Sequence, residues 1–159
     1  MAELTPLDEK IAEVLGLAQA GQQVTETVSK MEGAEDFADD LQRMQDQAAE
    51  TEQRTDAYVD TLEGKKTAIR EKARETKGEA TEMMKTYLAD EEEALDGFEF
   101  LTMAEAGELG HWEIVQRMSE TLGEQEVSQL ADWAVGVQRK HFDTVRESSL
   151  ELATSEARG

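Results

Sequence analysis

Proline occurs only once in this chain, as Pro6, close to the N-terminus. Because proline removes a backbone N–H and clashes with the preceding helical turn, its absence from residues 7–159 leaves all later segments free to form long helices. Aromatic residues are few, at 5% of the chain, while good helix formers such as Ala, Glu, Gln and Leu are frequent. A chain of 159 residues can bury a core, so we expect one all-α domain over residues 1–159.

Apolar side chains recur at alternating spacings of three and four, which is the spacing of one helical face. Thr5 is expected to cap the first helix, with Pro6 at its first position. A glycine follows three of the predicted helices, as is typical of C-terminal stops. The predicted helices cover residues 6–32, 34–63, 90–122 (beginning between 90 and 96) and 124–153, with stops at Gly33, Gly64 and Gly123 and a frayed tail at 154–159.

Residues 65–90 carry few large apolar side chains before Met83, and Gly78 interrupts their thin apolar stripe. We interpret this segment as a long, partly helical crossover with one or two helical pieces. A bundle needs such a connection when its second and third long helices are parallel. The sequence therefore predicts an antiparallel four-helix bundle with a crossover between helices 2 and 3.

The formal net charge is −21, from 37 acidic and 16 basic residues. Such a charge argues against binding to nucleic acid or to an anionic membrane surface, and it suits solubility, cation attraction or a salt-rich cytoplasm. The absence of cysteine excludes disulfides, thiolate zinc sites and cysteine nucleophiles. Since neither a membrane-span pattern nor a secretory signal is recognisable, we expect a cytoplasmic protein.

The two histidines both fall on predicted helical seams, each three residues after a polar side chain. Glu108 precedes His111 in this way, and Gln138 precedes His141. A carboxylate and an imidazole one turn apart is the pattern by which di-iron and di-manganese bundles hold metal. The short turn at Gly123 makes the two helices antiparallel neighbours, so Glu108 and Gln138 are expected at the same height.

The same count places His141 near Glu105, which predicts a cluster of Glu105, Glu108, His111, Gln138 and His141. Imidazole with carboxylate suits Fe, Mn or Zn, whereas glutamine is a poor ligand. In the alternative interpretation, the histidines are hydrogen-bonded packing residues, and Glu105 or Glu108 accepts a hydrogen bond from His141. Carboxylates that are buried need either a cation or a proton.

Residues 49–51 read Ala-Glu-Thr, and residues 111–114 read His-Trp-Glu-Ile. These motifs are similar to the Glu-Glu-Thr and Glu-His-Tyr-Glu-Ile motifs of the YciE/YciF-type ferritin-like family. The resemblance continues into the fourth helix and covers about two thirds of the chain. It implies a ferritin-like four-helix bundle, usually a homodimer, with a dinuclear metal site and a link to the stress response.

Several of the family's ligand positions hold other residue types in this chain. Among these positions only Glu50 and Glu113 carry a carboxylate, which is too few for a dinuclear site. Two of these positions hold glycine, at Gly21 and Gly110, which suggests that ligands have been lost. On this alignment the family's ligand positions fall at Gly21, Gln47, Glu50, Gly110, Glu113 and Gln138.

Two functional hypotheses follow. The first is a ferritin-like, metal-binding, stress-related protein, in which any reaction would be metal-assisted oxidation of iron or removal of peroxide. The second is a metal-free helical bundle with a structural or interaction role, which has lost the family's dinuclear site. A partly disordered stress protein, suggested by residues 65–79, disagrees with the apolar seams elsewhere. The predicted ligands for Fe, Mn or Zn are Glu50, Glu108, His111, Glu113 and His141.

Overall fold

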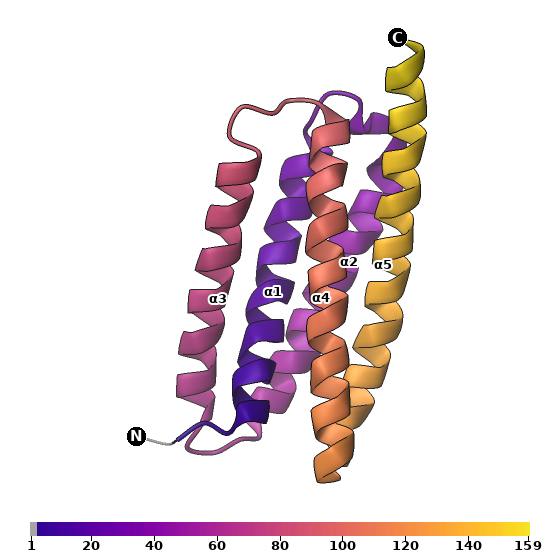
Figure 1. Ribbon diagram of the computed structural model, residues 1–159. Coiled ribbons are helices and arrows are strands. Elements are labelled where there is room, and N and C mark those ends of the chain that lie inside the picture. The colour runs from indigo at the N-terminus through magenta and orange to yellow at the C-terminus, as the bar shows by residue number, and fades with distance from the viewer. Residues whose placement is uncertain (1–2) are drawn as a thin grey trace.

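The computed structural model describes residues 3–159, and the regular structure in that range is helical. Consecutive long helices run in opposite directions, and the two chain ends lie at opposite ends of the molecule (Figure 1). A short 3-10 helix, η1, precedes the second long helix. The helices are α1 Pro6–Ser29, η1 Ala34–Phe37, α2 Ala38–Asp60, α3 Lys66–Tyr87, α4 Ala94–Leu122 and α5 Gln125–Arg158.

Four helices, α1, α2, α4 and α5, contact one another in a ring, and α3 packs on α1. The chain passes through α3 from one end of the molecule to the other, so α2 and α4 run in the same direction (Figure 1). The all-α helical architecture and the helical crossover are therefore confirmed. The crossover is a single helix, and the interruption of its apolar stripe at Gly78 does not break it.

The contact between α3 and α1 depends on Gly16. A Cβ atom on Gly16 would lie 2.8 Å from Thr76 Cβ and 3.1 Å from the backbone nitrogen of Lys77. Ile69 and Ala73 are fully buried on the same face of α3. A thin apolar stripe is thus enough to dock α3, because the glycine lets the two backbones approach closely.

The helix ends follow the predicted signals in most places. Thr5 Oγ1 accepts a hydrogen bond from the Asp8 amide at 3.1 Å, and Asp8 Oδ2 accepts one from the Thr5 amide at 2.9 Å. This reciprocal pair caps α1. Gly123 ends α4 with a left-handed backbone, at φ 69°. The predicted end at Ala153 is too early, because α5 continues to Arg158.

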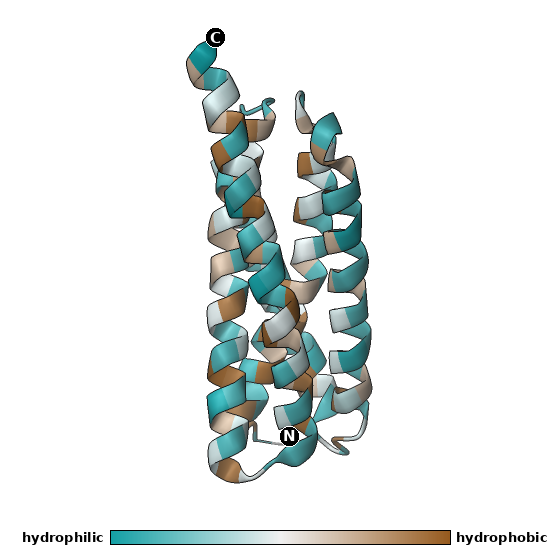
Figure 2. Cartoon of the chain, turned by 90° about the vertical axis from the view of Figure 1, so that its right-hand side faces the viewer, coloured by the Kyte–Doolittle hydropathy of each residue, from teal (hydrophilic) through white to brown (hydrophobic). Residues whose placement is uncertain are grey.

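The core consists of two hydrophobic clusters, one centred near Trp112 and the other near Phe98. Hydrophobic residues alternate with hydrophilic ones along the helices, as expected when each helix buries one face (Figure 2). In the described part of the chain, no helix combines the length and the apolar character needed to cross a membrane. Polar side chains from α2, α4 and α5 meet between the two clusters.

Candidate functional site: a buried polar cluster

The polar cluster contains Gln47 of α2, Glu105 and Glu108 of α4, and Gln138 and His141 of α5. The four residues from α4 and α5 expose only 2–8% of their surface. Their meeting at one height confirms the count outward from Gly123. Each of these residues lies on the inward face of its helix, so burial follows from the helical spacing.

The side-chain amide of Gln138 links the two carboxylates. Its Nε2 atom donates hydrogen bonds to Glu108 Oε2 at 2.8 Å and to Glu105 Oε2 at 3.0 Å. An amide NH₂ group has two hydrogens, so it can serve both acceptors at once. The group that joins the two carboxylates is therefore a neutral amide donor.

His141 extends the cluster toward α2. Its Nε2 atom donates a hydrogen bond to Gln47 Oε1 at 2.6 Å, because a carboxamide oxygen can only accept. Its Nδ1 atom lies 3.6 Å from Glu105 Oε2. The ring therefore lies between an amide oxygen and a carboxylate, as the packing interpretation of this histidine expects.

Glu108 holds a proton more readily than an ordinary glutamate. Burial raises its pKa well above the usual value, the neighbouring charge of Glu105 raises it further, and the hydrogen bond from Gln138 lowers it in part. The Oε1 atom of Glu108 faces Gly21, on which a Cβ atom would lie only 2.9 Å away. Burial thus favours the protonated form of Glu108, which needs no cation to balance its charge.

The structure does not bring His111 into this cluster. Its Nδ1 atom contacts the backbone oxygen of Gly107 at 2.8 Å, and its Nε2 atom lies 3.7 Å from Glu13 Oε2 on α1. The side chain is 40% exposed. The predicted convergence of His111 with His141 is wrong for this reason: one ring turns toward α1 and the other toward α2.

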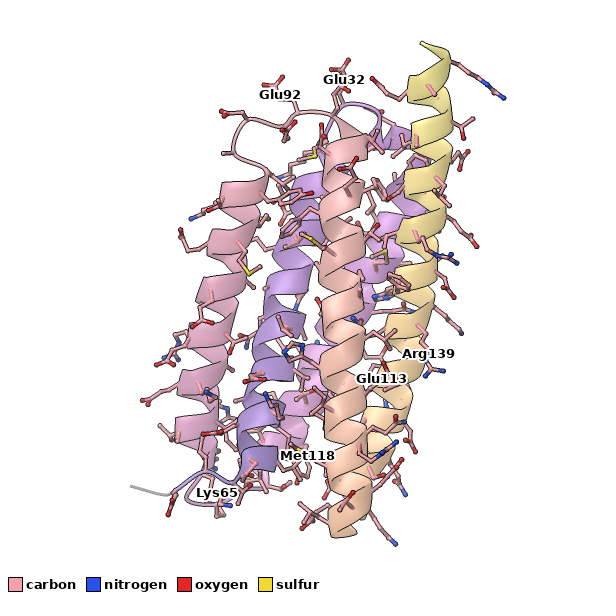
Figure 3. The ribbon with its side chains drawn as sticks, viewed as in Figure 1. Glu32, Lys65, Glu92, Glu113, Met118 and Arg139 are labelled. Atoms are coloured by element: carbon pink, nitrogen blue, oxygen red, sulfur yellow. The ribbon has the colours of Figure 1, made fainter. Side chains whose placement is uncertain are left out.

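Glu50 and Glu113 lie at the surface in ion pairs. Glu50 Oε2 is 2.7 Å from Arg54 Nη2, and Glu113 Oε2 is 3.3 Å from Arg139 Nη2 (Figure 3). Each carboxylate thus has a cationic partner outside the polar cluster. Of the five predicted ligands, only Glu108 and His141 belong to the cluster.

The sequence interpretation did not include Gln47 among the residues that meet His141. A signal for it exists, because Gln47 lies three residues after Met44 and four before Thr51, both of which are buried on the inner face of α2. Glutamine at such a position predicts a hydrogen-bonding partner on a facing helix.

The donor set does not fit a dinuclear metal group. Among residues 3–159, no group of three or more His, Asp and Glu side chains has the arrangement needed to hold a metal ion. The same residues contain no fully buried side-chain nitrogen or oxygen without a hydrogen-bond partner. Two of the five cluster residues are glutamines, which are poor ligands for Fe, Mn and Zn. The arrangement supports a hydrogen-bonded cluster.

No protein-family model, curated protein or solved structure matches this chain. The functional interpretation therefore depends on the geometry of the cluster and its surroundings.

Proposed function

We propose that this protein is a metal-free helical bundle with a structural or interaction role. In this proposal, a hydrogen-bonded polar cluster stands where the resemblance to ferritin-like proteins places a dinuclear site. The observation that carries the proposal is the Gln138 amide, which donates to both Glu105 and Glu108. A cation between these carboxylates would have to displace that amide.

The environment of Glu108 also supports this proposal. The residue of α1 opposite Glu108 is Gly21, which offers no ligand atom and leaves little room for a side chain. Burial raises the pKa of Glu108, so a proton can neutralise this carboxylate without a metal ion.

A polar layer of this kind can fix how the helices are aligned. The hydrogen bonds of the cluster join α4 to α5 and α5 to α2. Sliding one helix along another would leave buried polar groups without partners, at a cost of about 1–3 kcal/mol for each group. The polar cluster would thus select one alignment of the helices and of the two hydrophobic clusters on either side of it. The acidic surface would remain available for partners.

Elemental analysis of protein purified without a histidine tag tests the proposal, together with thermal unfolding in chelator and in added Mn²⁺, Fe²⁺ or Zn²⁺. We expect less than about a tenth of an equivalent of metal and no change in Tm beyond about 1 °C. About one equivalent of metal or more, with a Tm that falls in chelator and recovers with the metal, would overturn it. The Glu108→Gln variant shows whether any such metal depends on the cluster.

A second candidate function is the ferritin-like, metal-binding, stress-related role with Fe, Mn or Zn. The observation that favours it is the 3.6 Å approach of His141 Nδ1 to Glu105 Oε2 within a buried carboxylate cluster. The same elemental analysis separates the two candidates. The homodimer implied by the resemblance stays a prediction, which light scattering of the purified protein measures directly.

A further inference from the structure

A cavity of about 250 Å³ lies beside the polar cluster, between α1, α3 and α4. Its walls are mostly apolar, and the polar side chains that line it are Glu105, Glu108 and His111, all from α4. An apolar cavity of about 150 Å³ is already large enough to take a benzene molecule. The side chains that form most of the apolar wall are Leu17, Val24, Met83, Phe100 and Leu101.

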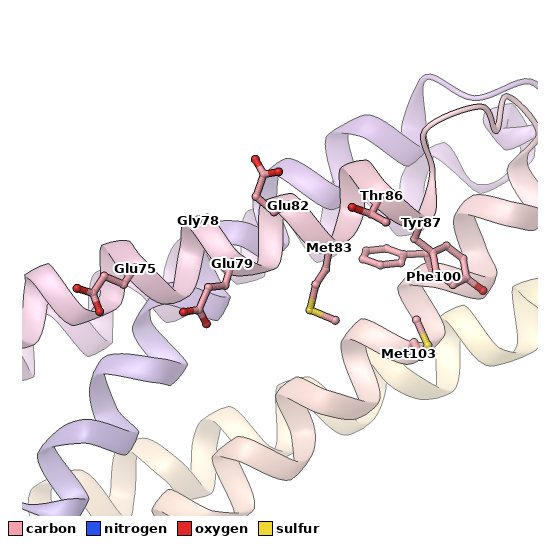
Figure 4. A pocket seen from close by; sticks show the side chains of 9 residues that line it. All are labelled: Glu75, Gly78, Glu79, Glu82, Met83, Thr86, Tyr87, Phe100 and Met103. Atoms are coloured by element: carbon pink, nitrogen blue, oxygen red, sulfur yellow. The ribbon is translucent and has the colours of Figure 1, made fainter.

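The cavity continues into a wider surface groove between α3 and α4, since Met83, Phe100 and Met103 line both (Figure 4). Met83 and Met103 are 63% and 50% exposed, which is unusual for large apolar side chains. Methionine side chains are flexible and adapt to apolar partners of different shapes. The groove thus offers an apolar entrance to the cavity.

A carboxyl oxygen of Glu108, which lines the cavity, makes no hydrogen bond within the described residues. Glu108 is 8% exposed, and its Oε2 atom accepts the hydrogen bond from Gln138. Its Oε1 atom makes no hydrogen bond to any described residue and lies on the side of Gly21, which also lines the cavity. No fully buried side-chain oxygen among residues 3–159 lacks a partner, so this oxygen is accessible on the side of the cavity. The other polar side chains in the cavity lining are Glu105 and His111.

The charges around the entrance are acidic. The charged residues that line the outer groove are Glu75, Glu79 and Glu82, and the groove lining includes no lysine or arginine. The whole chain carries a net charge of −21. This field attracts cations and repels anions, so it selects among apolar molecules by the charge of their polar group.

We propose that the cavity binds a hydrophobic amine, whose ammonium group donates a hydrogen bond to Glu108 Oε1 and whose apolar body lies against α1, α3 and α4. The ammonium would take over the charge compensation that a proton otherwise provides, so Glu108 would release its proton when the amine binds. The bound ammonium would then give Oε1 a charge-assisted partner and stabilise two neighbouring carboxylates at once. A carboxylate ligand would add a third negative charge beside them. An alcohol would gain only a neutral hydrogen bond. This inference goes beyond the proposed structural role and is tested by a different measurement.

The test is calorimetric titration with n-octylamine, 1-octanol and octanoate, combined with NMR of ¹³C-methyl methionine. We expect saturable binding of n-octylamine that shifts the methyl signals of Met83 and Met103. We expect 1-octanol to bind more weakly by about tenfold or more, and octanoate not to bind.

Two variants locate the site. Glu108→Gln keeps an acceptor for Gln138 but cannot ionise to pair with the ammonium, so n-octylamine should bind about tenfold or more weakly. Ala80→Phe places a larger side chain in the cavity wall on α3 and should also abolish binding. The matched control is Glu99→Gln, an exposed carboxyl on α4 outside the cavity, which should bind like the wild type.

Binding of n-octylamine that is unchanged in both Glu108→Gln and Ala80→Phe would overturn the assignment of the cavity. Equal affinity for 1-octanol, or absence of saturable binding to the folded wild type, would overturn the assignment of an amine. Circular dichroism melts of each variant confirm that a loss of binding occurs in folded protein. Metal content does not enter this test, so the amine proposal and the metal-free proposal can fail separately.

Discussion

The Nε2 atom of Gln138 on α5 lies 2.8 Å from Glu108 Oε2 on α4, in the middle of the helical bundle. Both side chains are buried, at 2% and 8% exposure. A hydrogen bond between a neutral amide and a carboxyl at this depth needs no cation. Exchanging an amide for a carboxyl group in this pair, or the reverse, therefore alters both the charge and the hydrogen bonds of the cluster.

Gln138→Glu replaces the amide donor by a third buried carboxyl. We expect the free energy of unfolding at pH 7 to fall by about 2–4 kcal/mol, because two hydrogen bonds are lost and like charges meet. The loss should shrink as the pH falls toward 5, since protonation removes the repulsion. Urea unfolding at both pH values measures this, and a variant as stable as the wild type at pH 7 would contradict the role of the amide.

Glu108→Gln should change how stability depends on pH. Burial, and then the charge of Glu105, raise the pKa of Glu108 above the ordinary glutamate value of 4.5. The folded protein therefore keeps a proton that the unfolded chain releases, so the contribution of Glu108 is fully present below pH 4.5 and is lost as the pH rises through its folded pKa. The variant cannot ionise at this position and should gain stability relative to the wild type as the pH rises.

Thermal unfolding between pH 4.5 and pH 8 checks this prediction. A gain of about 1 kcal/mol would raise Tm by about 2–4 °C in a protein of this size. Glu99→Gln, which changes an exposed carboxyl on the same helix, serves as the control. Parallel curves for Glu108→Gln and the wild type would show that Glu108 does not retain its proton.

His141→Leu removes the donor to Gln47 Oε1 and the partner of Glu105 Oε2. We expect a loss of about 1–3 kcal/mol, because both acceptors lose a buried contact. Gln47→Leu combined with His141→Leu should recover part of that loss, since the amide no longer needs a partner. A double-mutant cycle in urea measures the coupling, and a coupling energy near zero would mean that the 2.6 Å contact is not significant for stability.

Gly16→Val should release α3 from α1. Its side chain would meet Thr76 and the α3 backbone, so we expect a loss of about 2 kcal/mol or more and early hydrogen exchange in α3. Gly78→Ala is the matched control, because nothing lies within 4 Å of a Cβ atom there. That change should stabilise α3 by about 0.5–1 kcal/mol through helix propensity. Retained protection of α3 in Gly16→Val would contradict the close packing.

The helices were predictable because their signals are local. The cap formed by Thr5 and Asp8 and the left-handed glycine at Gly123 each depend on a few neighbouring residues. The sequence left open whether the crossover contains one helical piece or two. It forms the single helix α3, because tertiary packing at Gly16 supports a helix whose own apolar stripe is weak. Local propensity contains no information about that contact.

The site was predictable only in part. Helical spacing placed Glu105, Glu108, Gln138 and His141 together, because all four lie on inward faces of two adjacent helices. The same spacing placed His111 wrongly. A position at the edge of the inward face can turn toward either neighbouring helix, and the contacts of its own helix with α1 decide the direction.

The most direct test of a cluster held by hydrogen bonds and a proton is the titration of its carboxyl groups by NMR, with ¹³C-labelled glutamate side chains. We predict one glutamate carboxyl that titrates well above all others in the folded protein, and that is missing from the spectrum of Glu108→Gln. A Glu108 signal, identified by its loss in Glu108→Gln, that titrates together with the exposed glutamates would contradict the account.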